Sequence, residues 1–277
     1  MQTGDSEFIG ARDTRLVRRW WLPDGTPRAV IVLVHGLRDH SARYDALARA
    51  LVEADIAVHA FDLRGHGKSA GDRVWVETFD DYVDDVERFL KLVSTQVSGK
   101  PLFLFGHSMG GAIATLTTLT RKPALAGLVL SAPALKPGDE VSPFLISVTG
   151  FLSRILPRLP VLKLPDAAFS RVPAAVADMV ADPLIENGSG PARTASELLG
   201  ALGRIGASME TLSTPVLLLH GTADKLTNPE GSKALHARAA STDKTLRLFD
   251  GWFHDLLHEP EAALVITEIV DWVEARA

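Results

Sequence analysis

The residue best placed to do chemistry in this sequence is a serine that stands between two glycines. The segment Gly106-His107-Ser108-Met109-Gly110 has the spacing G-x-S-x-G. Where such a segment joins a strand to a helix, the glycines allow a sharp backbone turn that exposes the serine hydroxyl. A hydroxyl becomes a good nucleophile only when a base takes its proton and a third group orients that base. Ser108 is therefore the candidate nucleophile, and an acid and a histidine should follow it.

The acid is expected directly after a later strand. Asp224 stands in such a place, at the end of Leu219-His220-Gly221-Thr222-Ala223-Asp224, and we assign it as the acid. Asp139 and Glu140 follow the preceding predicted strand and remain the alternative acids. Their position in the chain order serine, acid, histidine also fits a catalytic triad of this type.

Three histidines compete for the role of general base. His254 lies between the last predicted strand and the last predicted helix, in the loop where the base is expected, and it is our assignment. His258 lies four residues further on, at the edge of that helix, and is the second choice. His220 stands at a strand end, where we expect hydrogen bonds to satisfy its ring nitrogens.

Two backbone N–H groups are expected to form an oxyanion hole. The N–H of Met109 opens the helix after the serine, where unpaired donors point at a developing negative charge. The second donor should come from the loop His35-Gly36-Leu37-Arg38-Asp39-His40, which follows the first buried strand. Because Gly36 permits close backbone approach, the N–H of Leu37 is the candidate.

The elements that position these residues alternate between short β-branched runs and longer amphipathic stretches. A run such as Ala29–Val34 is too short and too β-branched for a helix and indicates a buried strand. Strands are predicted over 29–34, 56–61, 101–105, 125–130, 215–219 and 245–249, and helices over 44–54, 79–97, 109–121, 230–240 and 260–275. This order predicts an α/β fold with a mostly parallel sheet flanked by helices on both faces.

The alternation stops between Lys136 and Leu212. Half of the sixteen prolines fall in this stretch, which is too long for a loop without structure of its own. We predict a helical cap over residues 137–212, inserted into a core formed by 1–136 and 213–277. The cap should cover the carboxyl ends of the strands, where open α/β sheets bind ligands.

The most apolar part of the predicted cap is the stretch 143–162, which also carries Arg154 and Arg158. Apolar side chains next to cations suit contact with a lipid interface. We expect Ile146 and Leu152 to bind the apolar part of a substrate, and the stretch to touch a micelle or membrane surface transiently. The alternative, that these side chains form the buried interior of the cap, stays open.

Composition excludes several classes of function. The chain of 277 residues has no cysteine, which removes disulfides, thiolate metal sites and a cysteine nucleophile. Its net charge of −5 and its 6% aromatic content argue against a nucleic-acid partner. The first fourteen residues lack the apolar run of a secretory signal, so we expect a cytoplasmic protein, at most peripheral to membranes.

Two patterns resemble cofactor or metal sites and lack their context. Gly65-His66-Gly67-Lys68-Ser69-Ala70 matches a dinucleotide fingerprint, but no predicted helix begins there. His254-Asp255-Leu256-Leu257-His258 resembles a zinc motif, but aspartate replaces the required glutamate and Pro260 follows at once. We therefore expect neither a cofactor nor a metal.

Four segments together resemble the monoacylglycerol lipase and lysophospholipase-like branch of the α/β-hydrolases. They are residues 35–44, Asp62-Leu63-Arg64-Gly65-His66-Gly67-Lys68-Ser69, 106–111 and 219–224, and the resemblance runs from about Arg28 to the C-terminus. It implies an α/β-hydrolase fold with a cap. It also implies a serine ester hydrolase that cleaves monoacylglycerols, or similar single-chain fatty-acid esters, to fatty acid and glycerol through an acyl-enzyme.

The resemblance further implies that Asp39 and Arg43 hold the glycerol head group. Relatives usually read His-Gly-x-Gly-Glu-His in this loop, whereas this chain has Arg38 in place of the second glycine and Asp39 in place of glutamate. The alternatives are a lysophospholipase or general carboxylesterase of the same fold, an aminopeptidase-like or haloperoxidase-like enzyme, and a non-catalytic ligand-binding protein.

Overall fold

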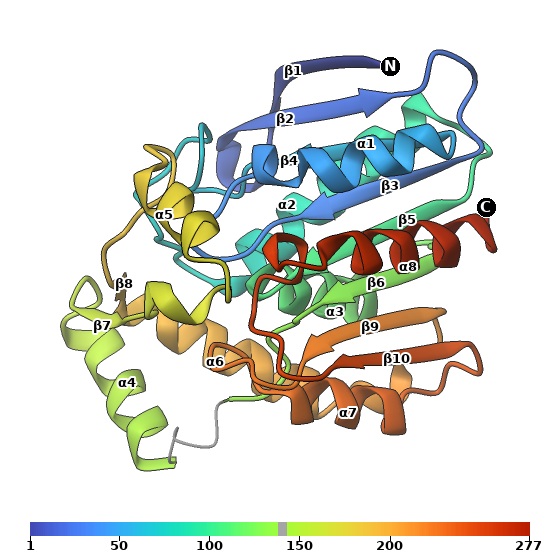
Figure 1. Cartoon of the computed structure of the whole chain (residues 1–277). Helices are drawn as coiled ribbons and strands as arrows, with labels where there is room; N and C mark the ends of the chain where they lie inside the picture. The colour runs from blue at the N-terminus through green and yellow to red at the C-terminus, as the bar shows by residue number, and fades with distance from the viewer. Residues whose placement is uncertain (138–142) are drawn as a thin grey trace.

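The central feature is a twisted sheet at the middle of the chain's fold (Figure 1). The computed structural model describes residues 1–137 and 143–277, with only the backbone of 143–147. The described residues form an eight-stranded sheet in the order β1-β2-β4-β3-β5-β6-β9-β10, parallel from β4 to β10. Its strands are β1 (Gln2–Ile9), β2 (Arg15–Leu22), β3 (Ala29–Val34), β4 (Ile56–Phe61), β5 (Leu102–His107), β6 (Gly127–Ser131), β9 (Val216–Gly221) and β10 (Lys244–Phe249).

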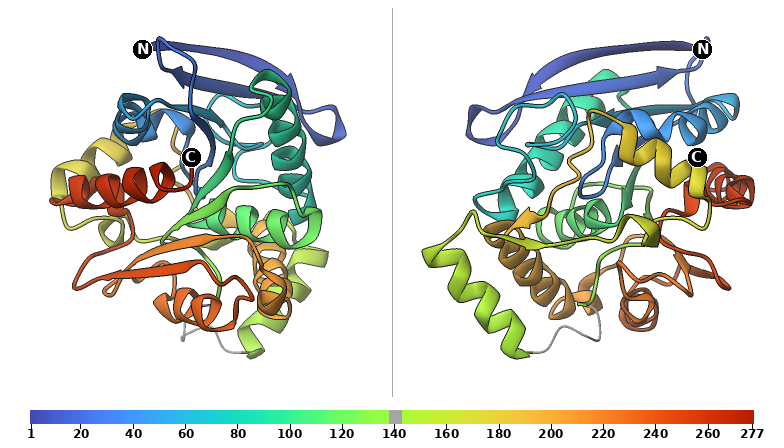
Figure 2. Two further views of the ribbon diagram at one scale, coloured as in Figure 1. Left: turned by 90° about the vertical axis from the view of Figure 1, so that its right-hand side faces the viewer. Right: turned by 60° about the vertical axis from the view of Figure 1, so that its left-hand side comes forward.

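Helices cover both faces of this sheet, as Figure 2 shows edge-on in its left view. One face carries α1 (Asp45–Glu53) and α8 (Ala262–Glu274), and the other carries α2 (Phe79–Gln96), α3 (Met109–Arg121) and α7 (Pro229–Arg238). The predicted apolar face of α2 is buried throughout, from Phe79 to Val93. The predicted α/β fold with a mostly parallel sheet is confirmed. Strands that are apolar on both faces have to be covered by helices on both faces, which is why the alternating pattern predicts this fold.

The first two strands, β1 and β2, were not predicted from the sequence. β1 and β2 pair antiparallel, and β2 then pairs antiparallel with β4, so β1 forms one edge of the sheet. Exposed and half-buried side chains alternate along β1, which therefore lacks the continuous apolar run that marks the central strands. An edge strand that buries little surface gives a weak hydrophobic signal.

The segment between β6 and β9 contains the predicted insertion, residues 137–212. Its described elements are α4 (Pro143–Ile155), β7 (Pro160–Leu162), α5 (Pro173–Ala181), β8 (Gly190–Pro191) and α6 (Ala192–Gly206). They lie on the side of the molecule toward which the arrowheads of the parallel strands point (Figure 1). The short β7–β8 pair was not predicted, and proline at a paired position of each strand explains why.

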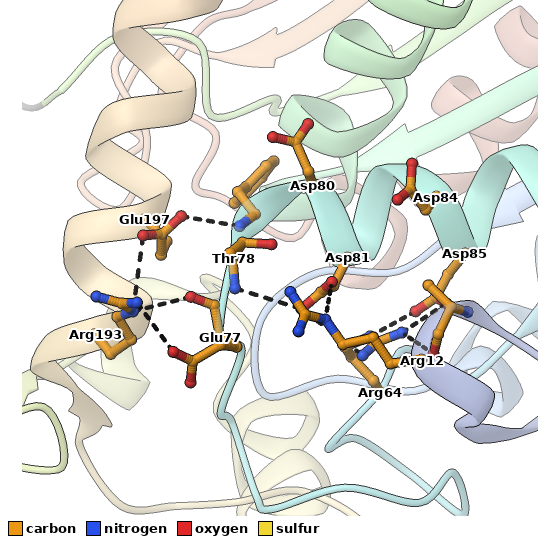
Figure 3. Close-up of polar contacts among 12 residues, drawn as sticks. Arg12, Arg64, Glu77, Thr78, Asp80, Asp81, Asp84, Asp85, Arg193 and Glu197 are labelled. Carbon is orange, nitrogen blue, oxygen red and sulfur yellow. Dashed lines mark hydrogen bonds and ion pairs between the residues drawn. The ribbon is translucent and has the colours of Figure 1, made fainter.

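Within the insertion, hydrogen bonds connect α6 to the N-terminal end of α2 (Figure 3). Arg193 Nε donates to the carbonyl oxygen of Glu77 at 2.9 Å, and Glu197 Oε2 accepts from the N–H of Phe79 at 3.0 Å. Further along α6, Arg204 donates to both carboxylate oxygens of Asp80. Helix α4 packs on α6 rather than on the sheet, so α6 joins the outer part of the insertion to the core.

A buried ion pair lies deeper at the same end of α2 (Figure 3). Arg64 Nε and Nη2 donate to the two carboxylate oxygens of Asp85 at 2.7 and 2.8 Å. Asp85 also accepts from the N–H of Ala11, and Arg64 donates to the carbonyl oxygen of that residue. The pair thus joins the connection between β1 and β2 to helix α2.

Candidate active site

Ser108 occupies the turn between β5 and α3 in a backbone conformation that residues with a side chain rarely adopt. Its φ is 55° and its ψ −123°. A Cβ on Gly106 would collide with the backbone of Gly110, and a Cβ on Gly110 would collide with the carbonyl oxygens of Val34 and His35. Only glycine fits at both positions. The tight turn holds Ser108 at the carboxyl edge of the sheet, partly open to solvent.

Asp224 and His254 meet at this edge although they come from the loops after two different strands. His254 Nδ1 lies 2.7 Å from Asp224 Oδ2, and both side chains are closed to solvent. The other carboxylate oxygen of Asp224 accepts from the N–H groups of Leu226 and Thr227 at 2.7 and 3.0 Å. The carboxylate is therefore fixed, and it orients the imidazole through Nδ1.

The contact between Asp224 and His254 shifts the pKa of both side chains. Burial by itself would raise the pKa of Asp224, but the charge of His254 and hydrogen bonds from His220 and His254 lower it below its usual range. Burial would likewise lower the pKa of His254, but the charge and hydrogen bond of Asp224 raise it above 6.5. Asp224 thus stays ionised at neutral pH, and the imidazole gains proton affinity.

Ser108 and His254 line one cavity of about 90 Å³. Leu37 and Met109, whose N–H groups are the predicted oxyanion donors, line the same cavity. A Cβ on Gly36 would lie 3.1 Å from Ser108 Cβ, so the glycine keeps the loop close to the serine. The cavity therefore brings together Ser108, His254 and the two residues that carry the predicted oxyanion donors, groups of the kind that acyl transfer uses.

Comparison with known protein families identifies this architecture. The family model described as serine aminopeptidase, S33 (Hydrolase_4), matches residues 25–261. The chain belongs to this α/β-hydrolase family. The matched residues include the whole segment between β6 and β9.

Individual relatives of this α/β-hydrolase carry lipase names. It is 35% identical to a monoacylglycerol lipase of Mycolicibacterium smegmatis over 97% of this chain and 96% of that one. It is 38% identical to human monoglyceride lipase, over 97% and 90% of the two chains. The crystal structure of a Paleococcus ferrophilus monoacylglycerol lipase superposes with a TM-score of 0.84 over the whole of both chains, at 32% identity.

In this α/β-hydrolase, Asp39 and Arg43 also lie in the cavity wall, bound to each other. Asp39 Oδ1 lies 3.1 Å from Arg43 Nη1, and its Oδ2 accepts from the Tyr44 hydroxyl at 2.7 Å. Arg43 Nη2 reaches Asp255 Oδ2 at 2.9 Å. Burial would raise the pKa of Asp39, but the charges of Arg43, His35 and His107 together lower it below its usual range. The hydrolase therefore carries a charged pair in the wall of the same cavity as Ser108.

The second-choice base, His258, has a different partner from His254. His258 Nδ1 bonds to Asp255 Oδ1 at 2.9 Å and not to Asp224. Asp139 and Glu140 fall outside the residues that the structure describes. His220 is held by hydrogen bonds, as predicted for a strand-end histidine: its Nδ1 lies 2.7 Å from Ser232 Oγ.

Two neighbours of Asp224 were not predicted as part of the site. Thr227 Oγ1 donates to Asp224 Oδ2 at 2.7 Å and lies 3.3 Å from His254 Nδ1. His220 Nε2 lies 3.2 Å from the same carboxylate oxygen. The signal for Thr227 was its place three residues after an aspartate, a spacing at which side chains and backbone often bond within a turn. Nothing local in the sequence indicated that His220 points at Asp224.

Among the described side chains, the apolar wall of the cavity does not include Leu152, one of the two residues predicted to bind the apolar part of the substrate. Its members come mainly from the insertion and the loops below it: Leu162, Leu164, Phe169, Leu198, Leu226 and Ala134. Leu152 is half-buried on α4 and is not among the lining residues in the described part of the chain. The Ile146 side chain lies outside the described residues. Within residues 1–137 and 143–277, no group of three or more histidines and acids has metal-binding geometry.

Proposed function

We propose that this chain is a serine ester hydrolase that cleaves monoacylglycerols, or similar single-chain fatty-acid esters, to fatty acid and glycerol. The observation that carries the proposal is that Ser108, in a strained turn, shares a cavity with His254, which is hydrogen-bonded to the buried Asp224. The lipase names of relatives that align along nearly the whole chain support the choice of substrate class.

In the proposed reaction, Ser108 is acylated and then deacylated. Since His254 Nδ1 is hydrogen-bonded to Asp224, Nε2 is the nitrogen that takes the proton as Ser108 Oγ attacks the ester carbonyl carbon. His254 then gives this proton to the glycerol oxygen as the carbon–oxygen ester bond breaks, which leaves acyl-Ser108. A water that loses a proton to His254 attacks the acyl-enzyme. The proton returns to Ser108 Oγ as the fatty acid is released.

Charge that develops on the carbonyl oxygen needs donors that are already in place. The N–H groups of Leu37 and Met109 are the proposed donors, because both residues line the cavity next to Ser108. One such donor contributes roughly 10²–10³-fold to kcat in serine hydrolases. Asp224 contributes by keeping the imidazole in the tautomer that accepts at Nε2 and by stabilising the imidazolium.

The cavity wall supports an amphipathic substrate. Arg43 and Asp39 are the polar part of the lining and are proposed to hydrogen-bond glycerol hydroxyls, while the apolar lining would take the acyl chain. A cavity of about 90 Å³ is smaller than the roughly 150 Å³ cavity that holds a single benzene. We propose that residues 137–212 act as a cap that moves to make room for a long acyl chain.

The outer part of the proposed cap carries exposed apolar side chains. Phe151 of α4 is 62% exposed and Ile155 is 56% exposed, and Arg154 and Arg158 lie beside them in the chain. Among the described residues, no helix is long and apolar enough to cross a membrane. We propose that this surface of α4 touches micelles or membranes transiently and that the enzyme is otherwise cytoplasmic. Leu152 and Ile146 are the proposed contacts for the acyl chain.

One substrate panel tests the proposed function. Wild-type enzyme and Ser108→Ala are compared on monoacyl-, diacyl- and triacylglycerols, a lysophospholipid, a short-chain ethyl ester and an aminoacyl amide at matched concentrations. Monoacylglycerol should give the highest kcat/KM, and Ser108→Ala should be inactive on every substrate. A preference for lysophospholipid or for the amide would replace the proposed substrate, the latter in line with the family's description as serine aminopeptidases.

A further inference from the structure

Arg38 follows the proposed oxyanion donor Leu37 directly and has an unusual conformation. Its φ is 57°, in the left-handed region that residues with a side chain seldom adopt. Its side chain is only 3% exposed, although arginine is almost never buried without partners. A buried guanidinium on a strained residue next to a catalytic loop therefore needs partners that hold both the charge and the backbone in place.

All of the hydrogen bonds of the Arg38 guanidinium that the structure describes go to the insertion. Nε donates to the carbonyl oxygen of Glu186 at 2.5 Å, and Nη1 donates to that of Leu164 at 3.1 Å. Nη2 donates to Asp166 Oδ1 at 3.0 Å and to Asn187 Oδ1 at 3.1 Å. These contacts use four of the five N–H donors of the side chain, and Asp166 compensates its charge.

The part of the insertion that carries the acceptors of Arg38 makes further hydrogen bonds, both within itself and to the oxyanion loop. Asn187 Nδ2 donates to the carbonyl oxygen of Val180, at the end of α5. Asp182 accepts from the N–H of Leu184 and lies 2.9 Å from Nε2 of His40, a second residue of the oxyanion loop. The loop and residues 164–187 are thus joined at two points, on either side of Asp39.

We propose that Arg38 is a positioning residue that couples the oxyanion hole to the closed insertion. Its contacts with Leu164, Glu186 and Asn187 hold Arg38 in the left-handed conformation and thereby fix the loop that carries the Leu37 N–H, so that this donor keeps its place beside Ser108. When residues 164–187 move away, the loop loses these contacts and relaxes. The inference rests on the proposed function, since an oxyanion hole has meaning only for acyl transfer.

Steady-state kinetics of Arg38→Gly on a soluble short-chain p-nitrophenyl ester test the proposal. Glycine adopts a positive φ without strain, so the substitution removes the guanidinium without a steric penalty in the backbone. We expect kcat to fall by about 10-fold, less than for complete loss of one oxyanion donor, with KM changed by less than about 3-fold. Added guanidinium ion should restore part of kcat in Arg38→Gly and leave wild type unchanged. Arg38→Lys, with a single ammonium, should lie between the two.

Arg204→Ala is the matched control, because Arg204 also joins the insertion to the core but touches Asp80, away from the oxyanion loop. It should keep the wild-type kcat. Wild-type kcat in Arg38→Gly, or an equal loss in Arg204→Ala, would overturn the proposal. Wild type that hydrolyses no ester would instead refute the proposed function.

Hydrogen exchange gives a readout that does not depend on activity, and a double variant adds a second kinetic test. Asn187→Ala removes one acceptor of Arg38, and hydrogen exchange should then become faster at residues 36–40 as well as in the insertion. The double variant with Arg38→Gly should lose no more kcat than Arg38→Gly alone, because both changes remove the same coupling. Unchanged exchange at residues 36–40, or additive losses of kcat, would contradict it.

Discussion

His254 Nδ1 and Asp224 Oδ2 lie 2.7 Å apart in a region closed to solvent, so the carboxylate acts on the imidazole at low dielectric. Thr227 and His220 contact the same carboxylate oxygen and hold it in place. His107, whose ring centroid lies 4.8 Å from that of His254, stays neutral because burial, helped by the charge of His254, lowers its pKa to about 4. The pH dependence of the enzyme should therefore report on His254.

The rate should fall at acidic pH with an inflection above 6.5. Asp224 raises the pKa of His254, and below that pKa the protonated imidazole cannot accept the proton of Ser108. A profile of kcat/KM against pH should rise through this region and then level. Asp224→Asn removes the carboxylate, so it should lower the inflection and reduce kcat by roughly 10⁴-fold.

His258→Ala is the control for this profile, because His258 pairs with Asp255 and not with Asp224. It should keep most of the activity and the same inflection, whereas His254→Ala should be inactive. An active His254→Ala together with an inactive His258→Ala would transfer the role of base to His258.

Ser108 should be the residue that a fluorophosphonate labels. Stoichiometric labelling of wild type and none of Ser108→Ala, with activity reduced by roughly 10⁴-fold or more, are the expected results, since the hydroxyl forms the acyl-enzyme. Intact-protein mass spectrometry measures the labelling. If the variant is labelled as well, another nucleophile carries the reaction.

Asp39→Ala should impair head-group recognition more than chemistry. A lost hydrogen bond between a charged group and a glycerol hydroxyl should lower kcat/KM for a monoacylglycerol by roughly 10-fold. The ethyl ester of the same fatty acid lacks those hydroxyls and should be nearly unaffected. Kinetics on the two esters, run in parallel, check this.

Tyr44→Phe is the matched control for Asp39→Ala. It removes the 2.7 Å hydrogen bond to Asp39 Oδ2 and leaves the carboxylate in the cavity wall. It should therefore preserve the preference for monoacylglycerol. Equal losses of Asp39→Ala on both esters would mean that Asp39 only holds Arg43 and the loop.

Phe151→Ser should reduce activity on micellar long-chain monoacylglycerol several-fold and leave a soluble short-chain ester unaffected. The Phe151 side chain is largely exposed, so its loss removes contact with the lipid aggregate but little packing. Leu264→Ser is the matched control, since Leu264 is equally exposed at 62% but lies on α8, outside the insertion. It should change neither activity.

The melting temperature of a Leu152→Ser variant distinguishes a role in packing from a role in contact with lipid, because Leu152 is half-buried. Leu152→Ser should lower the melting temperature if this side chain packs inside the insertion, since large-to-small changes in a core cost about 2–5 kcal/mol. A drop of the melting temperature in Phe151→Ser as well would remove the case for an interfacial surface on α4.

Asp85→Ala should destabilise the fold strongly. It leaves the buried Arg64 guanidinium without its carboxylate, a change that typically costs about 3–5 kcal/mol. The free energy of unfolding from urea titration measures the loss. Glu268→Ala, which breaks the exposed pair with Arg247, should cost less than about 1 kcal/mol.

Local sequence determined the elements and the position of the serine. The strand Ala29–Val34 and the helix Met109–Arg121 were predicted with the bounds that the structure has, because β-branched runs and amphipathic spacing act within a few residues. The G-x-S-x-G turn is equally local, since its glycines are required by backbone contacts around Ser108. The edge strand β1 was not predicted, because it buries too little apolar surface to give a hydrophobic pattern in the sequence.

Tertiary structure decided which side chains meet. His254 and His258 lie four residues apart in one loop, yet the first bonds to Asp224 and the second to Asp255. Arg38 finds its acceptors 126 to 149 residues further along the chain. Such pairings depend on where separate loops come together at the carboxyl edge of the sheet and on how the insertion closes over them. No short-range pattern encodes that geometry, because it is set by the packing of the whole domain.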